Sequence, residues 1–178
     1  LFVGRLHKQK NLIELVKAFK KVKNQFPTYK LLLVGEGPQK SEIQKMVIGL
    51  KLNKAVKIVG ELKGKDLVKA YSQSSVFILP SIYEGQPLTL LESWATKTPP
   101  ITSRTGDSPY LIKNGINGFL ISGGFDSDAI ASTIIKALKK SDLQKIGDNG
   151  NKYVEKNFSW SKSADKTFKI YEKFAASN

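Results

Sequence analysis

The stretch Lys30-Leu31-Leu32-Leu33-Val34-Gly35-Glu36-Gly37-Pro38 indicates how this chain folds. Residues 31–34 are apolar at successive positions, so a strand built from them would be buried on both faces, as in a parallel sheet covered by helices. Gly35 ends the strand, and Pro38 is a favourable first residue for the helix that the pattern predicts over 38–50. The stretch therefore predicts a strand, a glycine turn and a helix, in that order.

The same alternation of short apolar runs and longer amphipathic segments continues along nearly the whole chain. Strands separated by helices indicate βαβ units. We therefore expect an α/β fold: a doubly wound, mainly parallel six-stranded sheet with helices on both faces. The first helix is expected to begin with a capping box formed by Asn11 and Glu14. The predicted strands are 1–3, 31–34, 56–59, 76–79, 100–103 and 118–121, and the predicted helices are 12–26, 38–50, 65–72, 87–96, 128–138 and 160–174.

Length and composition limit what the chain can be. Its 178 residues suit one domain over 1–178 with a substantial core. With no cysteine and one histidine, it has no disulfide, no thiolate nucleophile and no multi-histidine metal site. No apolar run approaches the roughly 18 residues that a membrane span needs. Because the first predicted strand begins at Leu1 without a leader, we expect a fragment whose upstream part is absent.

The chain is strongly basic, with 29 Lys+Arg against 15 Asp+Glu and a net charge of +14. Only Arg5 and Arg104 are arginine, whereas recognition of bases and bidentate recognition of phosphates rely on arginine. We therefore expect no nucleic-acid partner. The excess lysines are interpreted mainly as solvated helix surface, and attraction to an anionic membrane surface remains a second interpretation.

Ligands of parallel sheets bind at the carboxyl ends of the strands, so five loops are candidates: 4–11, 35–38, 60–64, 81–87 and 103–109. In the loop 4–11, Arg5 and Lys10 lie between a strand end and a helix start, which suits an anion or leaves two exposed cations; His7 is expected to be exposed. In the loop after the second strand, Gly35 permits close approach of a ligand or simply a tight turn. The chain has no P-loop motif and no complete dinucleotide fingerprint.

The strongest group of polar residues lies in the stretch 79–92. Glu84 follows an apolar strand, and Glu92 lies in the second turn of the next predicted helix. Between them, the amides of Leu88 and Thr89 are free donors at a helix start. Carboxylates for hydroxyl groups and amides for a phosphate suit a sugar joined to a nucleotide through a diphosphate. The alternatives are surface charges without a function, or the acid/base pair of a glycoside hydrolase.

Several of these motifs together resemble a known family. The chain is similar, almost end to end, to the C-terminal domain of retaining glycosyltransferases of GT-B fold, the large family that includes mannosyltransferases and sucrose and glycogen synthases. The resemblance implies a Rossmann-like lobe that binds a nucleotide-diphosphate-sugar. The motifs that carry it are 4–6 through Lys10, 33–38, 56–60, the loop 80–85 with Glu92 beyond it, and 117–120.

The resemblance implies a role for each matching residue. Arg5 and Lys10 would hold the donor diphosphate, and Glu84 would bond hydroxyls of the transferred sugar; these three form the predicted catalytic set. Glu92 would bond the ribose, and the backbone around Ile58 would meet the base. Backbone amides of Gln86, Leu88 and Thr89 would line the sugar and phosphate. The remaining predicted donor-binding positions are Gly4, Gly35 and Gly85.

The resemblance also implies partners and a location. No metal and no cofactor are expected, because cations and a helix dipole would neutralise the leaving diphosphate. A glycan, lipid-linked or small-molecule acceptor would bind mainly to an N-terminal domain that is absent here, so this chain alone is expected to be inactive. A role in polysaccharide or glycolipid biosynthesis is expected, in the cytoplasm, with peripheral attachment to a membrane as the second option. The other candidate functions are a non-catalytic basic module for an anionic polymer or membrane surface, and a glycoside hydrolase or phosphorylase.

Three positions depart from the family pattern. Pro87 replaces a common glycine, and Lys97 replaces a small glycine after the helix. In the run 106–110, Tyr110 stands in place of an acid, so we interpret this loop as structural packing.

Overall fold

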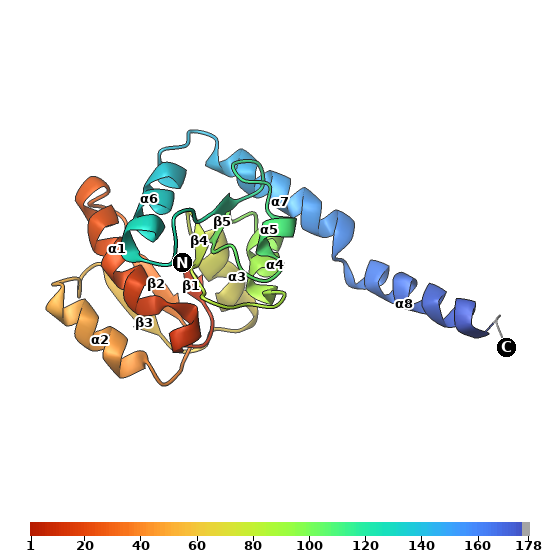
Figure 1. Cartoon of the computed structure of the whole chain (residues 1–178), viewed down its shortest axis with the longest axis horizontal. Coiled ribbons are helices and arrows are strands. Elements are labelled where there is room, and N and C mark those ends of the chain that lie inside the picture. Colours follow the sequence, from red (N-terminus) through yellow and green to blue (C-terminus); the bar gives the residue numbers. More distant parts are fainter. Residues whose placement is uncertain (176–178) are drawn as a thin grey trace.

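The computed structural model describes residues 1–175 and confirms an α/β fold of parallel strands and helices (Figure 1). The strands are β1 (Phe2–Val3), β2 (Leu31–Val34), β3 (Val56–Val59), β4 (Phe77–Leu79), β5 (Pro100–Thr102) and β6 (Phe119–Leu120). The helices are α1 (Leu12–Gln25), α2 (Lys40–Gly49), α3 (Gly64–Ser72), α4 (Leu88–Ala95), α5 (Ser108–Leu111), α6 (Ser127–Leu138), α7 (Leu143–Asn157) and α8 (Trp160–Ala175).

The six expected strands are present but are divided between two parallel three-stranded sheets, ordered β1-β2-β3 and β4-β5-β6. The sheets meet where β1 lies beside β4. Here the Ile78 amide donates to the Leu1 carbonyl at 2.7 Å, and the Leu1 amine donates to the Val76 carbonyl at 3.0 Å. Because β1 has two residues, it pairs with β4 too briefly to join the sheets into one ladder.

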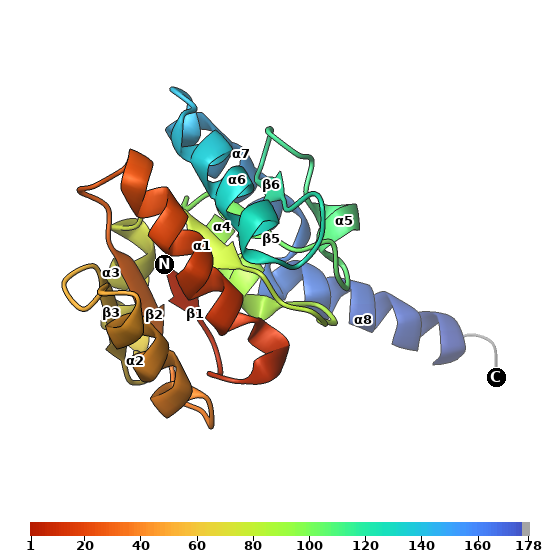
Figure 2. The same cartoon turned by 60° about the vertical axis from the view of Figure 1, so that its left-hand side comes forward.

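Helices cover both sides of the strands (Figures 1 and 2). Helix α1 packs against α2 and α6, and α4 packs against α7. The larger core lies around β1, β2 and β4, and a smaller apolar cluster surrounds the fully buried Trp94 of α4. This arrangement follows from the sequence, because strands that are apolar on both faces must be covered on both.

One predicted helix cap and one predicted helix start are wrong: α1 begins at Leu12 as expected, but without the expected cap. Asn11 has a left-handed backbone (φ 57°) and makes no side-chain cap; its amide group instead donates to the Phe125 carbonyl at 2.7 Å. The expected capping box with Glu14 is therefore absent. Helix α2 begins at Lys40, so Pro38 lies in the preceding turn.

Helix α7 was not predicted from the sequence, because two glycines interrupt its apolar pattern. The structure shows why they are there. A Cβ on Gly147 would lie 2.1 Å from the Lys97 carbonyl oxygen, and a Cβ on Gly150 would lie 2.0 Å from the Trp94 ring. The glycines let α7 approach α4 closely, so in this helix they serve packing rather than turning.

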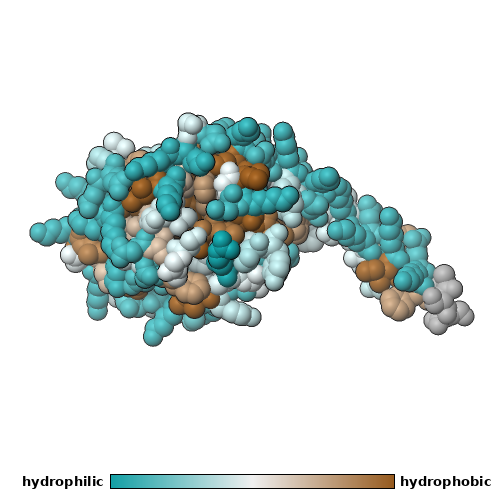
Figure 3. Space-filling view, turned by 45° about the horizontal axis from the view of Figure 1, so that its top comes forward, coloured by the Kyte–Doolittle hydropathy of each residue, from teal (hydrophilic) through white to brown (hydrophobic). Residues whose placement is uncertain are grey.

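Helix α8, predicted from its apolar spacing, extends away from the rest of the molecule (Figure 1). All of its residues are exposed, and Figure 3 shows apolar side chains on its surface. The large apolar side chains exposed on it are Trp160, Phe168, Ile170, Tyr171 and Phe174. Among residues 1–175, no helix is both long and apolar enough to cross a bilayer.

Candidate functional site

The loops that follow β1 and β4 come together, as parallel strands side by side predict. Lys10, in a 3₁₀ turn over Lys8–Lys10, donates from Nζ to Oε1 of Glu84 at 2.5 Å. Gln9 Nε2 donates to the Tyr83 carbonyl at 2.8 Å, and the Ile82 amide donates to the Gln9 carbonyl at 2.8 Å. These contacts dock the Lys10 turn onto the Glu84 loop and bring two predicted catalytic residues into one site.

The Lys10–Glu84 ion pair is largely shielded from solvent, with side chains 20% and 9% exposed. Within residues 1–175, the carboxylate uses Oε1 for Lys10, and Oε2 has no hydrogen-bond partner. An ammonium has three donors, so Lys10 keeps two for another acceptor. The pair therefore offers both a cation and an anionic oxygen to a ligand that carries phosphates and hydroxyl groups.

The start of α4 adds donors beside this pair. Pro87 stands before the first turn without capping it through a side chain, and the amides of Leu88 and Thr89 have no hydrogen-bond partner in the described chain. Gly85 and Gln86, between Glu84 and this turn, are exposed. The free amides and the helix dipole favour an anion here.

Arg5 lies in a neighbouring pocket rather than in the ion pair. The pocket has a volume of about 480 Å³ at the carboxyl ends of β1, β2 and β3, and Gly4, Gly35 and Glu61 also line it. The Arg5 side chain is exposed and has no hydrogen bond or ion pair within residues 1–175. Its guanidinium is available to an anion at the edge where parallel sheets bind ligands.

Glycines at the β2 end are required by the packing of the chain itself. Gly35 has φ +133°, and a Cβ on it would lie 2.0 Å from the Gly4 carbonyl oxygen; a Cβ on Gly37 would lie 2.4 Å from the Leu6 carbonyl oxygen. The turn after β2 thus fits against the loop after β1. This close contact sets the position of the backbone that lines the Arg5 pocket.

The predicted contact of the base with the backbone around Ile58 remains a prediction. Ile58 is half-buried in β3 and lines a shallow groove beside Val47 and Ile48 of α2. The residues of this segment that line the Arg5 pocket are Glu61 and Leu62. A base in that pocket would therefore meet the chain just after β3.

Glu92 is half-buried in α4 and accepts a hydrogen bond from the Tyr71 hydroxyl at 2.9 Å. This contact weighs against the alternative interpretation of Glu92 as a mere surface charge. Sequence reasoning gave Tyr71 no role, because it appeared as an ordinary apolar position of a short helix. The phenol is 1% exposed, and burial together with the Glu92 charge raises the pKa of Tyr71 well above its usual range.

The loop after β5 packs against the Glu84 loop. The Asp107 amide donates to the Gly85 carbonyl at 3.0 Å, and Gly106, at φ +54°, leaves room for only a hydrogen where a Cβ would lie 2.0 Å from the same oxygen. These contacts agree with the packing role expected for 106–110.

Tyr110 is exposed, and His7 is half-buried, with Nδ1 accepting from the Gln9 amide at 3.3 Å. The expectation of an exposed His7 is thus only partly met.

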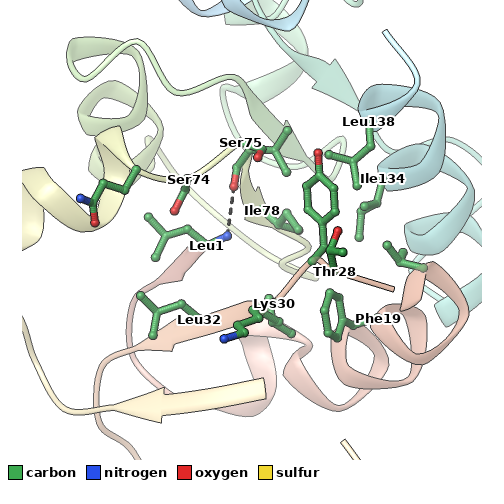
Figure 4. Close-up of a pocket in the computed structure, with 15 residues that line it drawn as sticks. Leu1, Phe19, Thr28, Lys30, Leu32, Ser74, Ser75, Ile78, Ile134 and Leu138 are labelled. Atoms are coloured by element: carbon green, nitrogen blue, oxygen red, sulfur yellow. Dashed lines mark hydrogen bonds between the residues drawn. The ribbon is translucent and has the colours of Figure 1, made fainter. Parts of the chain in front are cut away.

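A second pocket, of about 310 Å³, lies at the opposite ends of the strands (Figure 4). It is lined by segments that precede β2 and β4, and by Leu1, Ile134 and Leu138. Since ligands of parallel sheets bind at the carboxyl ends of the strands, this pocket is not the candidate site. Among residues 1–175, no group of three or more metal-ligating side chains occurs.

The fold is that of the C-terminal lobe of glycosyltransferases with GT-B architecture. The chain matches the family described as glycosyl transferases group 1 over residues 1–157, and it belongs to that family.

Individual relatives agree. The chain is 30% identical over 173 residues to an uncharacterized glycosyltransferase of Methanocaldococcus jannaschii, covering 97% of this chain and 44% of that protein. It is 29% identical over 172 residues to the UDP-Gal:alpha-D-GlcNAc-diphosphoundecaprenol alpha-1,3-galactosyltransferase of Escherichia coli, covering 95% of this chain and 44% of that protein. The chain therefore spans less than half the length of these curated relatives.

A solved structure gives the same assignment. Sucrose-phosphate synthase from Thermosynechococcus elongatus superposes with a TM-score of 0.87 at 29% identity, covering 99% of this chain and 45% of that one. The C-terminal domain of a glycosyl transferase group 1 family protein from Francisella tularensis shares the fold, with a TM-score of 0.78 at 24% identity, covering 89% of this chain and 85% of that one.

Proposed function

We propose that the chain is the donor-binding C-terminal domain of a retaining glycosyltransferase that moves a sugar from a nucleotide-diphosphate-sugar to a glycan, lipid-linked or small-molecule acceptor. The observation that carries this proposal is the Lys10–Glu84 pair beside the free amides of α4. The galactosyltransferase relative has UDP-Gal in its name, which supports a nucleotide-sugar donor. The acceptor would be bound mainly by the rest of a longer protein.

In this proposal each part of the site has one task. Lys10, Arg5 and the start of α4 bind the diphosphate and stabilise the charge that develops on it as the sugar leaves. Glu84 accepts hydrogen bonds from hydroxyls of the sugar and thereby orients it. Because protein cations perform the neutralisation, we propose that no metal or cofactor is required. Nucleotide-sugars are made in the cytoplasm, so we place the enzyme there, with peripheral attachment to a membrane as part of the proposal.

Calorimetric titration of the chain with UDP, GDP and ADP tests the proposal. At least one should bind, and Lys10→Ala and Arg5→Ala should each weaken it about tenfold, the effect of losing one charge-assisted hydrogen bond. Lys17→Ala is the matched control, because Lys17 pairs with Glu14 on α1, away from the site. Absence of binding to all three nucleotides would overturn the proposal.

The alternative of a basic binding module gives a different result. Such a module would bind anionic vesicles or a polyanion with an affinity that falls steeply with salt. That affinity would be the same in Glu84→Gln, whereas the transferase site requires Glu84 for the sugar-dependent part of donor binding. Turnover of a simple glycoside or sugar phosphate without nucleotide would instead favour a hydrolase or phosphorylase.

A further inference from the structure

Tyr71 connects two helices through one hydrogen bond. It lies in α3, and its hydroxyl donates to Oε2 of Glu92 in α4 at 2.9 Å, with the Thr89 carbonyl 3.4 Å away. Both acceptors lie in the first two turns of α4, which follow the Glu84 loop. The phenol therefore contacts the helix whose start carries the free amides of Leu88 and Thr89.

Tyr71 also makes contacts outside α4 that fix its position. It packs against Phe77 of β4 with ring centroids 5.5 Å apart, and the Tyr71 carbonyl accepts a hydrogen bond from Thr98 Oγ1 at 2.9 Å. Tyr71 is 1% exposed, so its side chain has no room to change rotamer. The position of the hydroxyl is thus set by the core.

Glu92, by contrast, is half-buried on a helix and has no second hydrogen bond from its side chain within the described chain. A glutamate side chain has three rotatable bonds, and fixing it costs conformational entropy. Burial and the neighbouring carboxylate raise the pKa of Tyr71, so the phenol stays protonated and remains a donor. The phenol occupies Oε2 and leaves Oε1 for a ligand.

We propose that Tyr71 is a positioning residue for ribose recognition, because its hydroxyl fixes the Glu92 carboxylate so that Oε1 accepts a hydrogen bond from the ribose of the nucleotide. This inference rests on the proposed function. Without the hydroxyl, the ligand itself would have to order the Glu92 side chain on binding. The entropy lost in that step would weaken the binding of ligands that carry ribose hydroxyls. Ligands without these hydroxyls would be unaffected.

The test compares UDP, GDP and ADP with their 2′,3′-dideoxy counterparts by calorimetry. Tyr71→Phe removes one oxygen and keeps the ring. It should weaken the ribonucleotide about tenfold while the dideoxy form binds as before, so the preference for ribose falls by the same factor. Glu92→Ala should also remove the preference, and adding Tyr71→Phe to it should change nothing further.

Tyr153→Phe is the matched control. Tyr153 packs on Trp94 from α7 and its hydroxyl has no hydrogen bond among residues 1–175, so the ribose preference should be unchanged. If Tyr71→Phe weakens both ligand forms equally, or keeps the preference, the positioning role is overturned although the proposed function stands. If the unaltered chain binds none of these nucleotides, the proposed function fails and this role fails with it. Far-ultraviolet circular dichroism shows that each variant is folded.

Discussion

Lys10 and Glu84 are 74 positions apart in the chain, yet Nζ of the first lies 2.5 Å from Oε1 of the second. Each residue follows a different strand, and the two strands belong to different sheets. The pair therefore connects the two sheets through the loops that follow β1 and β4. The stability of the chain should depend on both residues of the pair.

Removing one partner should expose this dependence. Lys10→Met leaves the 9%-exposed Glu84 carboxylate without its cation and should lower the free energy of unfolding by about 2 kcal/mol. The double variant Lys10→Met/Glu84→Gln should recover part of the loss, because no buried charge remains. Urea denaturation measures both. Lys17→Met, at a pair more accessible to solvent (side chains 42% and 26% exposed), should change stability by less than about 0.5 kcal/mol; an equal effect in the two lysine variants would contradict the difference in burial between the pairs.

The close approach of α7 to α4 makes a second prediction. Gly150→Ala places a methyl group where the Trp94 ring lies 2.0 Å away, so the helices must separate, at a cost of about 1–3 kcal/mol. Gly49→Ala is the control: it lies at the end of α2 with nothing within 4 Å, and should stabilise by about 0.5–1 kcal/mol. Thermal unfolding should therefore shift in opposite directions, and two shifts of one sign would count against this packing.

Lys97 occupies a position that favours glycine. It follows α4 with φ 58°, a left-handed conformation that costs a residue with a Cβ about 1–2 kcal/mol. Lys97→Gly should raise the free energy of unfolding by about 0.5–1 kcal/mol, after allowance for the greater entropy of the unfolded chain. Lys45→Gly, inside α2, should lower it by about 1 kcal/mol. A lower Tm for Lys97→Gly would refute the assigned conformation.

Helix α8 should contribute nothing to the stability of the rest of the chain. None of its residues is buried, and the helix extends away from the rest of the molecule (Figure 1). A chain ending at Ser159 should therefore unfold at the same temperature and bind nucleotide with the same affinity as the 178-residue chain. Differential scanning calorimetry checks this. A lower Tm for the shortened chain would mean that α8 packs against the body.

Asp126 should give part of the stability a dependence on pH. Its carboxylate caps α6, and hydrogen bonds from the Ala129 and Asp128 amides hold the pKa of Asp126 below its ordinary value. A depressed folded-state pKa contributes stability above the unfolded-state value and loses it as the pH falls. Asp126→Asn keeps an acceptor without titrating. The free energy of unfolding of the unaltered chain, relative to that of Asp126→Asn, should therefore fall as the pH drops from about 5 to about 3, and parallel stability curves would exclude this contribution.

Local patterns predicted much of the fold. Apolar runs located β2, β3 and β4 within one residue, and the amphipathic spacing located α1, α3 and α6. They failed for α7, because Gly147 and Gly150 are unfavourable in an isolated helix. These glycines are favourable only because α7 packs closely against a partner helix, and the local sequence does not show which helix that is.

The candidate site divides in the same way. Arg5, Lys10 and Glu84 in strand-end loops, and Glu92 in the helix after one of them, were predicted from sequence, because the carboxyl ends of parallel strands form one edge. The residues that hold them in place were not predicted. Tyr71, which donates to Glu92, and Asp107, which donates to the Gly85 carbonyl, lie in segments whose local sequence shows no functional signal.

The sequence by itself therefore determined the α/β class, the loops and the charged groups that they carry, since each is a property of neighbouring residues. The tertiary structure decided that Lys10 meets Glu84, that Tyr71 holds Glu92 and that six strands form two sheets. These outcomes depend on which strands become neighbours and how closely helices pack. Such distances are fixed by the whole core at once and not by any one segment.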